Sequence, residues 1–261
     1  MQIYNMNVVI IGNGNVAHFM GKTILKSGHR ILHVAGRNLL HTQVLADALG
    51  VPAVAIKDAH HEFVDLILVA ISDQALPELK NELPFAQIPI FHTAGAVSIE
   101  VLKDLGDVYG VLYPLQSIHK NTAETTSVPY IINGNNAEAI HCITAFAQTL
   151  SAEVHLKSDE ARLKLHLGAV VVNNFTNHLY TLVQDFCTQE KIEFQLLYPL
   201  IEETTQRLKD QKASLVQTGP AKRHDLATIH THVQLLQQYP ALEKLYQQFS
   251  ASIQAYYAHY L

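Results

Sequence analysis

The stretch Asn7-Val8-Val9-Ile10-Ile11-Gly12-Asn13-Gly14-Asn15-Val16-Ala17 decides how the rest of the chain is interpreted. It begins as an apolar run of strand composition, and an amphipathic stretch, residues 18–27, follows the glycines. The order is therefore a strand, a tight turn and a helix. Gly12 permits a sharp turn, Gly14 permits the backbone to approach a pyrophosphate, and the small Ala17 permits the helix to pack closely on the strand. These are the requirements of a dinucleotide fingerprint, G-x-G-x-x-G/A, in which the helix start binds the phosphates.

We therefore expect a dinucleotide site formed by one contiguous segment: Gly12, Asn13, Gly14, Asn15, Val16 and Ala17. The alternative is that the glycines form a plain structural turn. The position of the motif, after an apolar strand and before a helix, favours the dinucleotide site.

Composition limits the classes of protein to consider. The chain has 261 residues, 48% hydrophobic and 16% charged, which is typical of a globular protein long enough for two domains. A net charge of −5 argues against a nucleic-acid partner. Cys142 and Cys187 form no Cys-x-x-Cys motif, which suits a reducing compartment. Residues 1–6 lack the positive segment of a signal peptide, and no apolar run approaches the ~20 residues of a membrane span, so we expect a cytoplasmic protein without a membrane partner.

The end of the second expected strand, residues 30–35, indicates which cofactor is preferred. An NAD site places an acidic residue here for the ribose 2′-hydroxyl, whereas an arginine accommodates the 2′-phosphate of NADP. This chain has Gly36-Arg37-Asn38 and no acid. We therefore expect NADP (NADPH), with Arg37 and Asn38 at its adenosine end; a solvated arginine is the alternative.

Strand and helix patterns alternate as far as residue 157. The expected strands after the first two are 53–56, 65–71, 89–92, 108–112, 130–133 and 153–155. The run 65–71 is apolar on both faces, which is typical of a central parallel strand. Expected helices cover 39–49, 74–83 and 137–150.

Ligands of parallel sheets lie beyond the carboxyl ends of the strands. We therefore expect the residues that end two neighbouring strands to lie near the nicotinamide: Ala70, Ser72, Asp73, His92 and Thr93. Two alternatives remain open, namely that Asp73 caps the following helix and that His92 is a buried structural residue.

The pattern changes at Ser158. Residues 159–190 form a long helical stretch, further helices follow, and no strand pattern recurs. We expect a dinucleotide-binding domain at residues 1–157 and an all-helical domain at 158–261.

Several motifs along the whole chain resemble one family. They are Gly12-Asn13-Gly14-Asn15-Val16-Ala17, Ile71-Ser72-Asp73, His92-Thr93-Ala94-Gly95, Tyr113-Pro114-Leu115-Gln116, Lys164 and His166 with Asn174-Phe175, and residues 218–225. The chain resembles NADP-dependent oxidoreductases with a Rossmann domain and a helical C-terminal domain of unknown function, which are distantly similar to pyrroline-5-carboxylate reductase, ketopantoate reductase and 6-phosphogluconate dehydrogenase.

The resemblance implies an α/β fold, in which a Rossmann-type doubly wound, mostly parallel sheet precedes an all-α domain like that of 6-phosphogluconate dehydrogenase. It also implies a homodimer formed through the helical domain. One position departs from the family pattern: a glycine separates the arginine and aspartate of the last motif, and His224 stands there in this chain. A backbone conformation that suits glycine is less favourable for histidine.

Candidate catalytic residues lie on the long helical stretch. At 3.6 residues per turn, His166, Asn173 and Asn177 share one face, and the valines at 170–172 indicate that this helix is buried. Such buried polar groups need partners, either a substrate or other protein groups. By resemblance, Lys164 and Asn174 are candidates for acid–base and orienting roles, although their spacing differs from Lys-x-x-Asn. We rank His166 above Lys164, because imidazole exchanges a proton near neutral pH.

Arg223 and Asp225 follow a Gly-Pro turn. Arg223 is a candidate clamp for a substrate carboxylate. The alternative is that Asp225 caps the next helix and Arg223 is its surface partner. Although the chain has 16 histidines, it lacks a His-Glu-x-x-His motif, and we expect no metal site.

Together these features predict an oxidoreductase that transfers hydride between nicotinamide and a small carbonyl, imine or alcohol held between the two domains. The alternative is a non-catalytic NADP-binding sensor or scaffold that acts through its helical domain.

Overall fold

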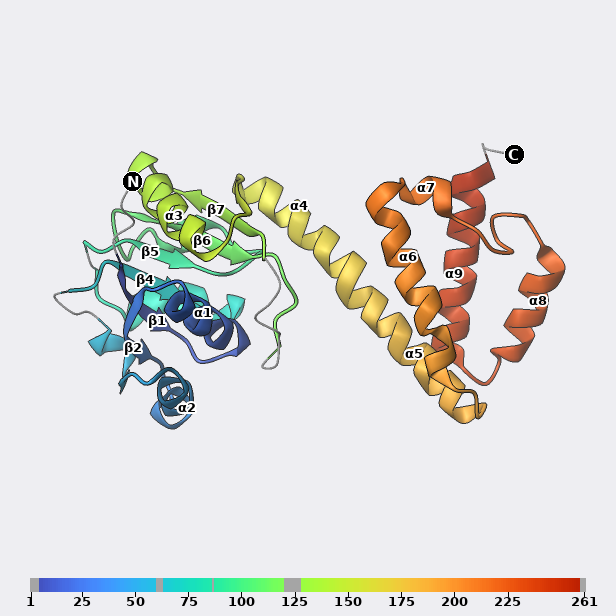
Figure 1. Ribbon diagram of the computed structural model, residues 1–261, viewed down its shortest axis with the longest axis horizontal. Helices are drawn as coiled ribbons and strands as arrows, with labels where there is room; N and C mark the ends of the chain where they lie inside the picture. Colours follow the sequence, from blue (N-terminus) through green and yellow to red (C-terminus); the bar gives the residue numbers. More distant parts are fainter. Residues whose placement is uncertain (1–4, 60–62, 86, 120–127, 259–261) are drawn as a thin grey trace. The chain divides into compact units, whose positions relative to one another are not determined.

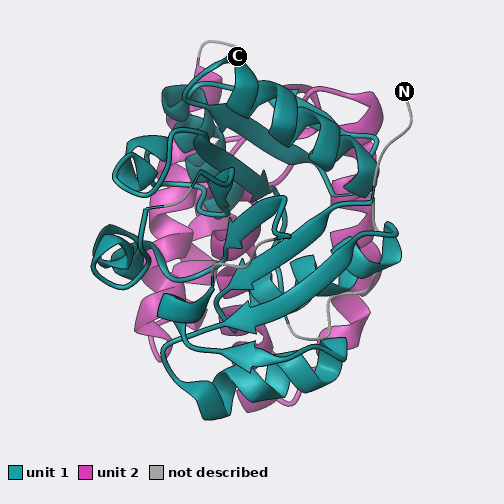
Figure 2. Ribbon diagram, turned by 90° about the vertical axis from the view of Figure 1, so that its left-hand side faces the viewer, with its two compact units in different colours: residues 1–170 teal, residues 171–261 magenta. Residues whose placement is uncertain are grey.

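The computed structural model describes residues 5–59, 63–85, 87–119 and 128–258. The start of the chain, on which the absence of a signal peptide was argued, lies partly outside the described residues. The chain divides into two compact units, unit 1 at Met1–Val170 and unit 2 at Val171–Leu261 (Figure 2). Each unit is described by itself.

Unit 1 is built on one eight-stranded sheet with the order β3-β2-β1-β4-β5-β6-β7-β8 (Figure 1). Strand β7 runs antiparallel to β6, and all other neighbouring strands are parallel. The strands are β1 (Asn7–Ile11), β2 (Arg30–Ala35), β3 (Ala53–Val54), β4 (Leu66–Val69), β5 (Ile90–His92), β6 (Tyr109–Pro114), β7 (Tyr130–Gly134) and β8 (Val154–Leu156). The predicted mostly parallel α/β fold is confirmed.

Strand β1 shows why both faces of this sheet are covered. Val8 and Ile10 belong to one apolar cluster and Val9 and Ile11 to another, because successive side chains of a strand point to opposite faces. All four side chains are fully buried. The first cluster packs under α1 (Asn15–Lys26), α2 (Leu39–Leu49) and α3 (Ala137–Leu150), and the second under the 3-10 helices η1 (Ile56–Asp58), η2 (Asp73–Asn81) and η3 (Ile99–Leu102).

One face of the sheet is covered by α-helices and the other by 3-10 helices, and the type of η2 differs from the expected one. Residues 74–83 were expected to form an ordinary helix, but residues 73–81 form a 3-10 helix. Pro77 lies inside this segment and has no N–H to donate to an α-helical ladder.

The described residues of unit 2 are helical and contain no strand. The chain passes from α4 (Asp159–Ala169) through the π-helical segment η4 (Val170–Phe175) into α5 (Thr176–Gln189). There follow η5 (Phe194–Leu197), α6 (Tyr198–Asp210), α7 (Ala213–Val216), α8 (Leu226–Leu235) and α9 (Pro240–Tyr257) (Figure 1). None of the helices in the described part of the chain is long and apolar enough to cross a membrane.

The compact units divide after Val170, whereas the predicted domains divide after residue 157. Helix α4 clusters with unit 1 because its Arg162 is buried against the loop that follows β5. The functional domain boundary at residues 157 and 158 stays a prediction.

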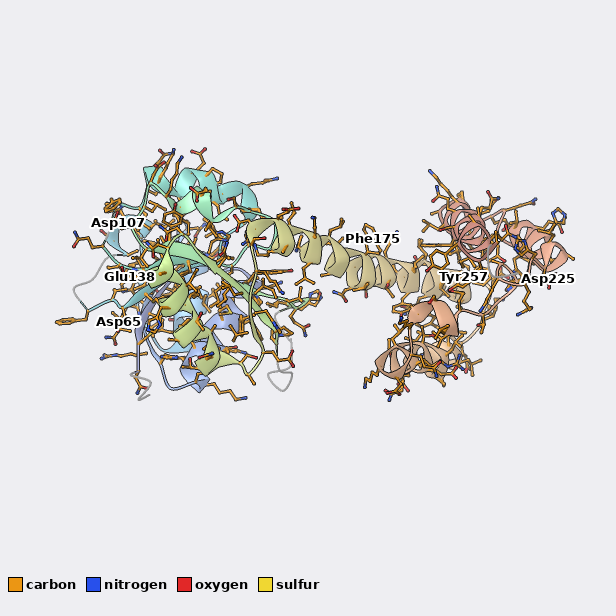
Figure 3. All side chains as sticks on the ribbon, turned by 90° about the horizontal axis from the view of Figure 1, so that it is seen from above. Asp65, Asp107, Glu138, Phe175, Asp225 and Tyr257 are labelled. Carbon is orange, nitrogen blue, oxygen red and sulfur yellow. The ribbon has the colours of Figure 1, made fainter. Side chains whose placement is uncertain are left out.

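The expectation that the helix around residues 170–175 is buried is wrong for the single chain. Val172 is 72% exposed and Phe175 57% exposed, and Phe175 projects from the helix in Figure 3. The segment is also π-helical, so the period of 3.6 residues used to place His166, Asn173 and Asn177 on one face does not run through it.

Candidate functional site

The glycine turn brings the carboxyl ends of three strands together. Gly12 has a φ of 120°, donates its N–H to the carbonyl of Ala35 over 2.8 Å, and would overlap the carbonyl oxygen of Ala70 if it carried a Cβ. Gly14 instead faces open space. Ala17 is fully buried and packs in the core. Gly12 and Ala17 therefore serve the fold, and Gly14 leaves room above the turn.

A cavity of about 610 Å³ lies over this turn, at the carboxyl ends of the parallel strands. Its predicted lining residues are Gly12, Asn13, Gly14, Asn15, Val16, Arg37, Asn38, Ala70 and Ser72. Sequence reasoning missed Gly36, His41, Ile56, Ile71, Ala75 and Ile118, which also line it. Most of the missed side chains are apolar and carry no chemical signature in the sequence.

The start of α1 on the cavity wall is suited to an anion. The first N–H groups of a helix have no partner within the helix, and Gly14, the N-cap residue, provides no side-chain cap. The first turn of α1 holds no acidic residue. The positive end of the helix dipole therefore has no carboxylate nearby on its own helix, and a diphosphate fits this wall.

Arg37 and Asn38 line the cavity at the end of β2. Asn38 caps α2 by accepting a hydrogen bond from the N–H of His41 over 3.1 Å. The Nε of Arg37 donates to Oε1 of Glu82 over 2.7 Å, and its Nη2 lies 2.6 Å from the same oxygen. Arg37 has no acidic neighbour in the sequence, and the acidic residue that contacts it is Glu82, which follows η2.

The residues that end β4 are only partly in the cavity. Ala70, Ile71 and Ser72 line it, whereas Asp73 is exposed at the first position of η2 and does not. The N-cap of η2 is Ser72, without a side-chain cap bond.

His92 and Thr93 do not line the cavity, because both side chains are buried in unit 1. Nδ1 of His92 accepts a hydrogen bond from the N–H of Ala94 over 3.1 Å. Burial, followed by the charge of Arg162, lowers the pKa of His92 to about 3. His92 is therefore a neutral structural residue, which is the alternative left open above.

His166 meets a tyrosine that the sequence did not single out as catalytic. Nδ1 of His166 lies 3.0 Å from the hydroxyl of Tyr113, and the two rings pack edge to face. Burial, followed by the charge of Asp73, raises the pKa of Tyr113. A Cβ at Gly95 would lie 2.6 Å from Nδ1 of His166, so the pair sits directly on this glycine.

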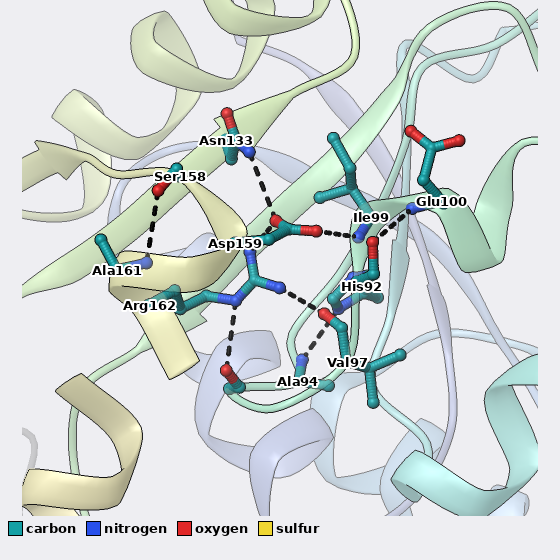
Figure 4. Close-up of polar contacts among 12 residues, drawn as sticks. His92, Ala94, Val97, Ile99, Glu100, Asn133, Ser158, Asp159, Ala161 and Arg162 are labelled. Carbon is teal, nitrogen blue, oxygen red and sulfur yellow. Dashed lines mark hydrogen bonds and ion pairs between the residues drawn. The ribbon is translucent and has the colours of Figure 1, made fainter. Parts of the chain in front are cut away.

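A buried arginine holds this glycine loop onto α4 (Figure 4). Arg162 is 1% exposed, and its Nε donates to the carbonyl of Gly95 over 3.2 Å. Its Nη2 donates to the carbonyl of Val97, and its Nη1 forms an ion pair of 2.7 Å with Asp159. Asp159 also accepts from the N–H of Ile99 over 2.9 Å. Every polar end of the guanidinium is thus paired, as a buried charge requires.

Two catalytic candidates chosen by resemblance are exposed. Lys164 is 73% exposed and forms an i,i+4 ion pair with Glu160 on the surface of α4. Asn174 is exposed in η4. The structure does not bring Lys164 into the Tyr113–His166 pair.

The turn before α8 supports the structural alternative for Asp225. Its carboxylate accepts from the N–H of Thr228 over 3.0 Å and from the Thr228 hydroxyl over 2.7 Å, and these bonds lower the pKa of Asp225. Arg223 is exposed. His224 has a φ of 54°, so a histidine occupies a left-handed conformation at the position where the resemblance led us to expect a glycine.

No group of three or more histidine, cysteine or acidic side chains is arranged to hold a metal ion within the described part of the chain.

The chain is 31% identical to a Bacteroides fragilis protein described as an NADP oxidoreductase, with 97% of this chain and 100% of that one covered and a TM-score of 0.89. The chain belongs to the NADP oxidoreductase family.

Two family profiles divide this oxidoreductase between them. Residues 7–90 match the profile described as NADP oxidoreductase, coenzyme F420-dependent, and residues 128–253 match the domain of unknown function DUF2520. The first match contains the glycine turn, Arg37 and Glu82. A search of curated proteins gave no match.

More distant solved structures share the fold. A 1-pyrroline-5-carboxylate reductase from Streptococcus pyogenes is 14% identical over 96% of this chain and 99% of its own, with a TM-score of 0.65. A reductive aminase from Aspergillus terreus, in complex with NADPH and ethyl-5-oxohexanoate, is 16% identical over 94% and 93%, with a TM-score of 0.67.

The buried His92 predicts how stability depends on pH. Its pKa of about 3 lies below the ordinary 6.5, so the unfolded chain binds the proton more tightly. The stabilisation is complete above pH 6.5 and is lost as the pH falls from 6.5 toward 3. Between pH 7 and pH 5, His92 should lower the free energy of unfolding of the wild-type protein by about 2 kcal/mol. We expect His92→Asn, which has no titrating ring, to lack this decrease when both proteins are measured by urea denaturation. The exposed His155→Asn is the control, and an unchanged slope in His92→Asn contradicts the assignment.

The Arg162 network predicts a large cost for one substitution on α4. Arg162→Met leaves the Asp159 carboxylate and two loop carbonyls without their donor, and we expect the free energy of unfolding to fall by about 3–5 kcal/mol. Lys164→Met, on the exposed side of the same helix, should change it by less than about 0.5 kcal/mol. Equal stabilities of the two variants, measured by urea denaturation, would show that the network does not hold the loop.

Proposed function

We propose that this oxidoreductase binds NADPH in the cavity over the glycine turn and reduces a small carbonyl or imine, or oxidises the corresponding alcohol or amine in reverse. The observation that carries the proposal is one cavity that combines the uncapped start of α1 with the guanidinium of Arg37. The family match favours this enzymatic function over a non-catalytic sensor.

Named groups of the cavity would hold the two charged ends of the cofactor. The N–H groups of Asn15 and Val16, at the start of α1, fit the diphosphate. Arg37 fits the 2′-phosphate, because guanidinium groups bind phosphate through paired N–H donors. Ala70 and Ser72, which follow the carboxyl end of β4, would then flank the nicotinamide half.

We assign the proton that accompanies hydride transfer to His166, positioned by Tyr113. Bound NADPH supplies the hydride. Because the pKa of Tyr113 is raised, its hydroxyl stays protonated at neutral pH, and it holds Nδ1 of His166 by a hydrogen bond. The imidazolium form of His166 would release its Nε2 proton to a substrate oxygen or nitrogen as the hydride is transferred, and would be left as neutral imidazole paired with Tyr113 through Nδ1.

The test is turnover of NADPH with a panel of aldehydes, keto acids and cyclic imines. We expect His166→Asn to lower kcat by about 10²-fold or more and Tyr113→Phe by about tenfold, with NADPH affinity changed less than about twofold. Tyr109→Phe, on the same strand but bonded to Glu100, is the control and should keep wild-type kcat. Wild-type kcat in both site variants would rule out the assignment, and NADPH binding without turnover on any substrate would favour the sensor.

We further propose that the protein is a homodimer formed through unit 2. The buried residues among the described positions of unit 2 are only Cys187, Ala221, Leu236, Ser250 and Tyr257. Large apolar side chains on its helices are exposed, Val172, Leu196 and Leu215 by 71–72%. So small a core is insufficient for a helical unit of this length, and a second copy would cover the exposed side chains.

Light scattering tests the dimer. We expect twice the 29.0 kDa of one chain, and a shift toward the single-chain mass in Val172→Glu. Leu40→Glu, at a still more exposed leucine of unit 1, is the control and should leave the mass unchanged. A single-chain mass for the wild-type protein would contradict the proposal.

A further inference from the structure

Arg37 does not face the cavity alone. One carboxylate oxygen of Glu82 bridges its Nε and Nη2 at 2.7 and 2.6 Å, although the two residues are 45 positions apart in the chain. Nη1 of Arg37 has no hydrogen-bond partner among the described residues. The side chains of Arg37 and Glu82 are 49% and 33% exposed, so the pair lies at the solvent edge of the cavity.

We propose that Glu82 is a specificity-determining residue, whose carboxylate weakens binding of the 2′-phosphate at Arg37 and so lets NADH compete with NADPH. This inference rests on the proposed dinucleotide site. Glu82 acts through Arg37, because Arg37 lines the cavity and Glu82 contacts Arg37.

The Glu82 carboxylate and a bound 2′-phosphate would compete for the one guanidinium of Arg37. A guanidinium presents its donors along fixed edges, and the Glu82 oxygen already occupies the Nε–Nη2 edge. A 2′-phosphate that binds this edge must displace the carboxylate. A 2′-phosphate that binds Nη1 instead stays within several ångströms of the carboxylate and is repelled by it. Both routes weaken NADPH binding.

The ribose of NADH carries a neutral 2′-hydroxyl, which meets no such repulsion. A carboxylate near this hydroxyl is the usual feature of NAD sites, and an arginine the usual feature of NADP sites. In this chain the arginine that lines the cavity forms an ion pair with a carboxylate outside the lining. The cofactor preference is therefore set by a balance between these two groups.

A purely positioning role for Glu82 is disfavoured by its exposure. An ion pair between exposed side chains holds its members weakly, so little orientation of Arg37 is lost with Glu82. The carboxylate repels a phosphate dianion whether or not it also orients Arg37. Removal of the charge should therefore strengthen NADPH binding.

The experiment compares the dissociation constants of NADPH and NADH by calorimetry for the wild-type chain, Glu82→Gln, Arg37→Gln and Asp104→Asn. We expect Glu82→Gln to tighten NADPH about three- to tenfold and to change NADH less than about twofold. The gain should shrink at 0.5 M salt, because exposed charges are screened. Arg37→Gln should weaken NADPH selectively. Asp104→Asn removes another exposed ion pair, with Lys80, and should change neither constant.

The outcomes separate the two claims. If Arg37→Gln selectively weakens NADPH but Glu82→Gln leaves it unchanged or weakens it, the role of Glu82 is wrong and the cofactor site stands. If the wild-type chain binds neither nucleotide, or Arg37→Gln weakens both equally, the proposed binding mode itself is wrong.

Discussion

The close approach of β1 and β4 at their carboxyl ends is the constraint on which the rest of unit 1 depends. Residue 12 must pass the carbonyl of Ala70 with no room for a Cβ, and it does so with a positive φ. Its N–H closes the same turn onto β2 through Ala35. Because the chain turns so sharply, α1 begins only at Asn15, and its N–H groups lie on the wall of the cavity. One glycine therefore joins the three strands and exposes the helix start that we propose binds the diphosphate.

Arg162 fixes the position of the proposed proton donor in a different way. It draws the carbonyls of Gly95 and Val97 toward α4, which brings His166 over Gly95 and against Tyr113. The absence of a side chain at Gly95 is again necessary, because a Cβ there would meet both rings. The buried charge is balanced by Asp159, whose pKa is raised by burial but lowered on balance by hydrogen bonds and by Arg162. The histidine–tyrosine pair thus depends on a network whose residues are not among those that line the cavity.

What could be predicted from the sequence was local. The glycine turn, the two-faced strands and the position of Arg37 follow from short patterns, and the sheet and cavity confirm where they lie. Contacts between distant residues had no such signal: Glu82 reaches Arg37, and Tyr113 reaches His166, across long separations. The same holds for Arg162, whose guanidinium reaches the carbonyl of Gly95, 67 positions away in the chain. The helical face expected to hold His166, Asn173 and Asn177 assumed a period of 3.6 residues, which the π-helical η4 interrupts. The valines of this segment suggested burial, but Val171 and Val172 are exposed in the single chain.

The most direct measurement is a crystal structure of the protein grown with NADPH. The account predicts the diphosphate on the N–H groups of Asn15 and Val16, with the 2′-phosphate at Arg37. A structure with the nucleotide bound elsewhere, or with the glycine turn empty at saturating NADPH, would contradict it.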